Sequence, residues 1–151
     1  MTDKERELIG HYPEAALLVA MAESAWNGVI KSARIDFSLS DRLKTELKKL
    51  LDKDIKSIFI TDSDVRHIKK KHSRGETLRG QVDIKPEDFA LIPVVMNEFD
   101  SVRHEDTDPL GNKKLVFVEK VNGDVYTVSV ERGNNQIGVI TLWKARSGAS
   151  C

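Results

Sequence analysis

The stretch LVFVEKVNGDVYTVSVERGNNQIGVITLW, residues 115–143, decides the fold. Residues 115–121 and 124–131 are rich in β-branched and aromatic side chains, and Asn122-Gly123 between them is the pair preferred in a two-residue type I′ hairpin turn. A second polar turn, RGNN, leads into QIGVITLW, where both faces carry apolar side chains, as in a central strand. The stretch therefore predicts a three-stranded antiparallel meander.

The N-terminal part of the chain favours helices. Residues 13–25 predict one helix with Pro13 at its start, and a second begins after Ser40, which we expect to be its N-cap. In the second helix, leucines at positions 43, 47, 50 and 51 form one apolar stripe. From Lys56 onward the helix-favouring pattern gives way to a short, apolar, strand-favouring run. We therefore expect an N-terminal helical region at 1–54 and an α+β domain at 55–151.

Two further helices are expected between the N-terminal region and the meander. SIFIT, residues 57–61, predicts a short strand, and Asp62 or Ser63 is expected to cap the basic helix DVRHIKKKHS that follows. PEDFALIPVVMN then predicts a helix that begins at Pro86 and is kinked or shortened by Pro93. Helices followed by a meander indicate an α+β fold rather than a doubly wound one.

Composition excludes several classes of protein. Cys151 is the single cysteine among 151 residues, so neither an internal disulfide nor a cysteine-based metal site is expected, and a reducing compartment suits the chain. The longest uncharged run near the start, residues 15–22, is too short to span a bilayer and lacks a basic flank leading to a cleavage site. We therefore expect neither a membrane anchor nor a signal peptide.

The formal net charge is zero, but the charges are segregated. Residues 66–74, RHIKKKHSR, hold five Lys or Arg, two His and no acid, whereas residues 83–108 hold eight acids and two bases. A bipolar protein of this kind can attract a polyanion at one face and meet a basic partner, or water, at the other.

The basic helix carries the clearest candidate chemistry. At about 100° per residue, Val65, Ile68 and His72 lie on one side, and His67 faces outward with Lys70 or Lys71 and Arg74. Cleavage of RNA by its own 2′-OH needs a base, an acid and cations that stabilise a negative phosphorane. His67 and His72 with Lys71 supply these without a metal. Of the two histidines, His72 is expected to be semi-buried and functional and His67 to contact substrate.

Two other interpretations of this helix stay open. The first is a solvated basic helix with one partly buried histidine. The second is a metal site, but zinc helices place their ligands at i and i+4, and His67 and His72 are five residues apart without a nearby cysteine. We therefore expect no metal and no cofactor.

The last strand and the acidic stretch add further candidates. The hydroxyl of Thr141 is expected to orient a phosphate if this strand packs beside the basic helix, and Lys144 to bind the phosphate. Trp143 is a candidate for stacking a base, although aromatic strand residues belong mostly to a core. Arg103 is either a phosphate clamp or an ion-pair partner of nearby acids. Lys70 and Arg74 complete the expected substrate-binding set.

Residues 58–144 resemble a group of phage and polymorphic-toxin nucleases. These are placed with barnase, EndoU, colicin and RelE ribonucleases on one shared fold, and they include C-terminal tRNase toxin domains of contact-dependent inhibition systems. The resemblance is carried by three motifs: a helix with an HI-x-KKH-like pattern, an EDF…IP helix, and a last strand with Thr followed by an aromatic residue. In this chain the motif positions are His67, Ile68, Lys71 and His72; Glu87, Asp88, Phe89, Ile92 and Pro93; and Thr141 with Trp143.

The resemblance implies N-terminal helices packed on a four- to five-stranded antiparallel sheet, with RNA bound in a cleft on the sheet. It implies an endoribonuclease that acts on tRNA and leaves 2′,3′-cyclic phosphate, with His67, His72, Lys71 and Thr141 as candidate catalytic residues. It also implies a cognate immunity protein, and action in the cytoplasm of a target cell after delivery as the C-terminal part of a larger secreted protein. The alternative is a non-catalytic module that binds RNA or a protein.

Overall fold

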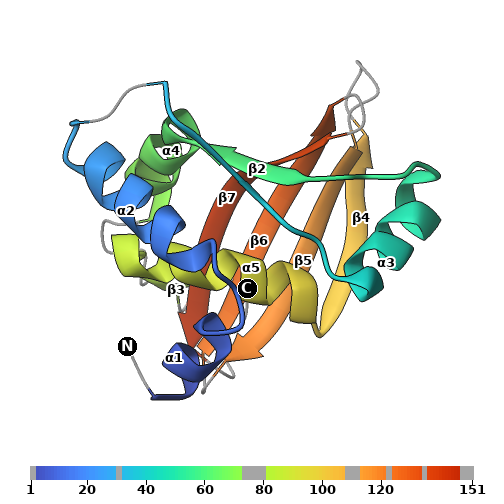
Figure 1. Cartoon of the computed structure of the whole chain (residues 1–151), viewed down its shortest axis with the longest axis horizontal. Helices are drawn as coiled ribbons and strands as arrows, with labels where there is room; N and C mark the ends of the chain where they lie inside the picture. The colour runs from blue at the N-terminus through green and yellow to red at the C-terminus, as the bar shows by residue number, and fades with distance from the viewer. Residues whose placement is uncertain are drawn as a thin grey trace.

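The computed structural model describes residues 3–29, 32–72, 81–107, 113–121, 124–133 and 136–146. Within these ranges one sheet has the strand order β1-β2-β7-β6-β5-β4, and β3 pairs separately with β7. The strands are β1 (Arg34–Phe37), β2 (Ile58–Thr61), β3 (Gln81–Val82), β4 (Ser101–Thr107), β5 (Lys113–Val121), β6 (Asp124–Gly133) and β7 (Gln136–Arg146). The helices are α1 (Asp3–Ile9), α2 (Ala15–Trp26), α3 (Asp41–Leu51), α4 (Asp62–His72), the 3-10 helix η2 (Pro86–Leu91) and α5 (Ile92–Glu98). The fold is α+β (Figure 1).

The antiparallel meander β5-β6-β7 confirms the prediction made from residues 115–143. Val121 pairs with Asp124, which leaves two residues for the connection. The predicted turns at 122–123 and 134–135 lie outside the described residues.

The described sheet is larger than the four to five antiparallel strands expected, and it is mixed, because β2 runs parallel to β7. The strands that were missed are β1, β3 and β4. β1 and β4 are edge strands of the main path. β4 has Val102 as its one apolar residue and β3 has two residues, so neither shows a strong period-2 apolar pattern. β1 does alternate, with apolar Ile35 and Phe37 between charged Arg34 and Asp36, but this strand is four residues long.

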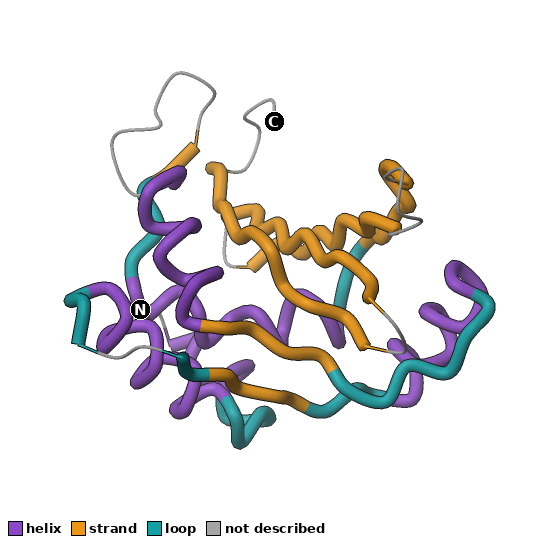
Figure 2. The backbone as a smooth tube through the Cα atoms, turned by 90° about the horizontal axis from the view of Figure 1, so that it is seen from above, coloured by secondary structure: helices purple, strands orange, loops and turns teal. Residues whose placement is uncertain are grey.

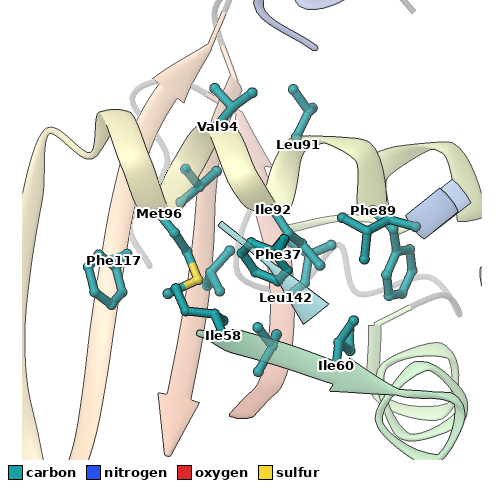
Figure 3. Packing of buried hydrophobic residues seen from close by; sticks show 14 of the residues in the cluster. Phe37, Ile58, Ile60, Phe89, Leu91, Ile92, Val94, Met96, Phe117 and Leu142 are labelled. Carbon is teal, nitrogen blue, oxygen red and sulfur yellow. The ribbon is translucent and has the colours of Figure 1, made fainter. Parts of the chain in front are cut away.

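The helices pack on the sheet around one hydrophobic core. Phe117, Val128 and Leu142 stand opposite one another on adjacent strands and are fully buried. Helix α5 packs across β5 and β6 on this face of the sheet (Figures 1 and 3). Ile92 and Met96 of α5 belong to the same buried cluster. So do side chains of α2, β1 and α3, which means that residues before and after position 54 share this core. The expected helical region 1–54 also supplies strand β1 to the sheet.

Local signals explain the helix boundaries. Ser40 caps α3 as predicted, since its Oγ accepts a hydrogen bond from the backbone N–H of Leu43 at 3.1 Å. The expected single helix from Pro86 is instead η2 followed by α5. Pro93 lies in the first turn of α5, where its missing N–H costs nothing, so it marks a new start rather than a kink. None of the described helices is long and apolar enough to cross a membrane.

Candidate functional site

The site is built around α4, whose first turn is locked by a capping box. The backbone N–H of Thr61 donates to Oδ2 of Asp64 at 2.9 Å, and the N–H of Asp64 donates back to the Thr61 Oγ1 at 3.3 Å. Thr61 is therefore the cap, one residue before the predicted Asp62 or Ser63. Since Thr61 is also the last residue of β2, the box fixes the angle at which α4 leaves the sheet.

Asp62 ties α4 to the chain that precedes β1. Its carboxylate is buried, accepts a hydrogen bond from the N–H of Ala33 at 2.8 Å and lies 2.6 Å from Nη1 of Arg66. Desolvation alone would raise the pKa of Asp62, but the hydrogen bonds from Arg66 and Ala33 outweigh it, so the pKa falls below its usual value. The carboxylate thus stays charged and holds Arg66 in place.

The remaining residues of α4 divide among three faces. Val65 and Ile68 are fully buried, as predicted, against β2, β7 and α2. Ser63, His67 and Lys71 follow one another at intervals of four and form an exposed stripe on another face. On a third side, Nζ of Lys69 donates to the backbone oxygen of Trp26 at 2.7 Å and anchors α4 to the end of α2.

Strand β7 meets this stripe at a β-bulge. In its pairing with β6, Ser129 stands opposite Thr141 and Val130 opposite Val139, so Ile140 is the extra residue. A bulge of this kind interrupts the alternation of side chains. Ile140 and Thr141 consequently lie on the face away from the core, whereas Val139 and Leu142 are fully buried.

A cavity of about 510 Å³ lies between α4 and the sheet. Ser63, Asp64, His67 and Lys71 of α4 line it together with Lys114 of β5 and Ile140 and Thr141 of β7. In the register of the sheet, Lys114 stands opposite Glu131 of β6, which stands opposite Gly138 of β7. Figure 2, turned by 90°, shows α4 beside the curved strands. Because residues of α4 line the cavity on one side and residues of β5 and β7 on the other, the helix forms one wall of a cleft and the sheet forms the other.

The cavity combines groups that can transfer protons and bind anions. His67 offers an imidazole, Thr141 a hydroxyl, and Lys71 and Lys114 two ammonium groups. Nζ of Lys114 lies 4.0 Å from Oε1 of Glu105, and Asp64 uses Oδ2 in the capping box. Within the described ranges, no group of three or more His, Cys, Asp or Glu residues could hold a metal ion.

The structure brings together three of the four residues predicted to be catalytic: His67, Lys71 and Thr141. The fourth, His72, is the last residue of α4, and its side chain lies outside the described residues, as does the whole of Arg74. Lys70 is exposed on α4 beside the stripe but does not line the cavity, so we leave this predicted substrate contact out of the site. Of the two histidines, His67 is the one that the structure places in the cavity. The sequence analysis expected His67 to contact substrate and His72 to be the principal functional histidine.

Lys144 must be reassigned. It follows the bulge on the core side of β7, where its Nζ lies 3.2 Å from Oδ1 of buried Asp88 and 5.7 Å from the centre of the Tyr126 ring. Only 13% of its side chain is exposed. Because a buried ammonium paired with a carboxylate is poorly placed to meet a phosphate, we leave Lys144 out of the site.

Two of the predicted substrate contacts share the open face of the sheet with Thr141. Trp143 is half-buried and lies two residues beyond Thr141, hence on the same face. Arg103 of β4 pairs with Val116 of β5, Val116 pairs with Ser129 of β6, and Ser129 pairs with Thr141 of β7. Arg103 and Thr141 are therefore the two ends of one cross-strand row, about 14 Å apart. Nη2 of Arg103 also lies 3.8 Å from Oε2 of Glu105. This is an ion pair with a nearby acid, the alternative role expected for Arg103.

Sequence reasoning missed Ser63, Asp64 and Lys114. The spacing of four between Ser63 and His67 was a signal that could have placed Ser63 on the stripe. Lys114 carried no such signal, because its approach depends on the register of three strands.

Comparison with known proteins identifies the family of this chain. The family described as phage-Barnase-EndoU-ColicinE5/D-RelE like nuclease3 matches residues 39–150, which include α4, the meander and every residue that lines the cavity. Searches of curated proteins and of solved structures returned no match. On this match, the chain belongs to the phage-Barnase-EndoU-ColicinE5/D-RelE like nucleases.

Proposed function

We propose that this nuclease is a metal-independent endoribonuclease that cleaves RNA by attack of a ribose 2′-OH on the adjacent phosphate. The observation that carries the proposal is the meeting of His67, Lys71, Lys114 and Thr141 in one cavity. An imidazole, two ammonium groups and a hydroxyl are sufficient for this chemistry, and the reaction needs no external nucleophile.

In the proposed reaction, His67 takes the proton of the 2′-OH as the 2′ oxygen bonds to phosphorus. The phosphorane carries extra negative charge, which the ammonium groups of Lys71 and Lys114 stabilise while the hydroxyl of Thr141 orients a non-bridging oxygen. The bond from phosphorus to the 5′ oxygen then breaks, and that oxygen takes a proton from the imidazolium or from a lysine. The products are a 2′,3′-cyclic phosphate and a 5′-hydroxyl.

The substrate we propose is tRNA, the class implied by the resemblance to toxin nucleases. The charge segregation supports a polyanionic substrate, since residues 66–74 hold five Lys or Arg and no acid. In this proposal the protein acts in the cytoplasm of a target cell and is restrained by an immunity protein. The immunity protein docks either on the cleft or on the acidic stretch 83–108 of the nuclease.

The test is incubation of purified protein with total tRNA in EDTA, with analysis of fragment ends. Discrete fragments that end in 2′,3′-cyclic phosphate support the proposal. His67→Ala and Thr141→Val are expected to abolish or strongly reduce them, and Lys70→Ala serves as a control on the same helix. Intact tRNA that still binds the protein would instead support the non-catalytic RNA-binding alternative. Cleavage that requires added Mg²⁺ would contradict the metal-independent mechanism.

A further inference from the structure

A second cavity adjoins the candidate active site. Its volume is about 680 Å³, and it shares Ser63 with the cavity that holds His67 and Thr141. One wall is the start of α4, with Asp62 and Arg66, and the other is the chain around the start of β1, with Ala33 and Arg34. If the scissile phosphate of an RNA strand lies at His67, the next nucleotide of the strand can pass Ser63 and enter this second cavity.

Arg34 has an unusual setting in the second cavity. Its guanidinium carbon lies 4.0 Å from the centre of the Phe59 ring, a cation–π distance. Two of its nitrogens, Nε and Nη2, donate to Oδ1 and Oδ2 of Asp36 at 2.6 and 3.1 Å. The ring of Phe59 in turn rests on Gly138, where an added Cβ would lie only 3.0 Å from Cζ of the ring. Gly138, Phe59 and Arg34 therefore form successive layers on the face of the sheet away from the core.

This stack leaves a planar group facing the cavity. Asp36 occupies guanidinium donors in the plane and Phe59 covers one face, yet 41% of the Arg34 side chain is exposed. Arg66 is likewise held by Asp62 at 2.6 Å. Because both arginines already have carboxylate partners, this cavity is better suited to a polar, uncharged planar group than to a second phosphate.

We propose that the second cavity binds the base of a nucleotide next to the scissile phosphate, stacked on the guanidinium of Arg34. The inference rests on the proposed function and specifies its substrate as RNA with an unpaired, unstacked nucleotide beside the cleavage point, because the faces of a base inside a duplex are covered by its stacked neighbours. Arg34 precedes the residues matched by the nuclease family, which begin at position 39. This base-binding wall is thus supplied by the chain's own N-terminal segment.

The test measures binding without cleavage. Fluorescent single-stranded 2′-O-methyl oligonucleotides, which cannot undergo 2′-OH attack, are prepared with one abasic site at each position in turn, and Kd is measured by anisotropy. For the wild type, one abasic position is expected to weaken binding about tenfold, as for loss of one stacked base. In Arg34→Ala the intact oligonucleotide binds about tenfold more weakly, and that abasic position no longer matters.

Two variants separate stacking from charge and from general effects. Arg34→Lys keeps the charge but lacks the planar group, so it is expected to behave like Arg34→Ala. Arg42→Ala is the matched control, since the Arg42 guanidinium lies 4.0 Å from the centre of the Phe99 ring, the same contact outside the cavity. It is expected to bind like the wild type and to retain sensitivity to the abasic site.

The outcomes are decisive for this proposal independently of catalysis. Full affinity and an unchanged abasic effect in Arg34→Lys, or a wild type indifferent to every abasic site, would overturn base stacking. Cleavage of tRNA by the same samples reports separately on the proposed function. If the wild type shows the Arg34-dependent abasic effect but never cleaves RNA, the base-binding site is supported and the proposed ribonuclease activity is contradicted.

Discussion

Nζ of Lys144 lies 3.2 Å from Oδ1 of Asp88, and this pair joins strand β7 to the 3-10 helix η2 in a nearly water-free position. The Asp88 side chain is 7% exposed, and its Oδ2 also accepts a hydrogen bond from the N–H of Lys85 at 2.8 Å. The pair lies on the face of β7 opposite Thr141. It therefore holds strand β7 from behind and does not face the cavity that Thr141 lines.

Removal of one partner of this pair should be costly. Asp88→Ala leaves the Lys144 ammonium buried without its carboxylate, and we expect a loss of about 3 kcal/mol in the free energy of unfolding. The measurement is urea denaturation, with Lys144→Met and the double variant Asp88→Ala/Lys144→Met completing a mutant cycle. The double variant is expected to be more stable than Asp88→Ala alone. If all three variants match the wild type, the pair has no structural role.

His67→Ala should separate activity from stability. His67 is exposed on α4, so its truncation removes little packing, and Tm should stay nearly unchanged. Loss of a general base or acid should lower kcat by about 10²- to 10⁴-fold. Full cleavage by a folded His67→Ala protein would remove His67 from the mechanism.

Lys71 and Lys114 should contribute to RNA binding through phosphate. For Lys71→Ala and Lys114→Ala, the slope of log Kd against log salt for single-stranded RNA should fall by about 0.7 each. Lys70→Ala is the control, because Lys70 belongs to the same helix and has the same charge but lies off the cavity stripe. An equal change in all three variants would indicate a diffuse charge effect instead of contacts in the cleft.

Glu119 should make stability fall as the pH rises. Burial, followed by the charges of Asp100 and Glu98, raises the pKa of Glu119 from 4.5 to about 7, against a smaller lowering by Arg42. Among the described residues, its Oε2 has no hydrogen-bond partner. The folded protein therefore binds the proton more tightly than the unfolded chain, and this contribution is complete below about pH 4.5 and is lost as the pH rises through about 7.

Glu119→Gln tests this dependence. The amide carries no charge at any pH, so the variant should be more stable than the wild type at pH 8, and the difference should shrink towards pH 4.5. Urea denaturation at a series of pH values measures it. A wild type and variant with parallel stability profiles would show that Glu119 titrates normally in the folded protein.

Much of the fold followed from local patterns. The meander from Lys113 onward was predictable because strand periodicity and turn residues act over a few positions. The same holds for Ser40 as a cap and for the buried pair Val65 and Ile68 on α4. The edge strand β4 escaped prediction because pairing with β5, rather than its own composition, makes it a strand. β1 was a missed local signal, since Ile35 and Phe37 alternate with Arg34 and Asp36.

The sequence alone determined which chemical groups this protein can use: two histidines and a run of lysines on one helix, and a threonine on the last strand. Only the tertiary structure decided which of them meet. The bulge at Ile140 interrupts the alternation along β7, so Thr141 faces α4 and Lys144 turns to the core. Lys114 reaches the same cavity through the register of β5, β6 and β7. Bulge and register depend on partners distant in the chain, and no local pattern specifies them.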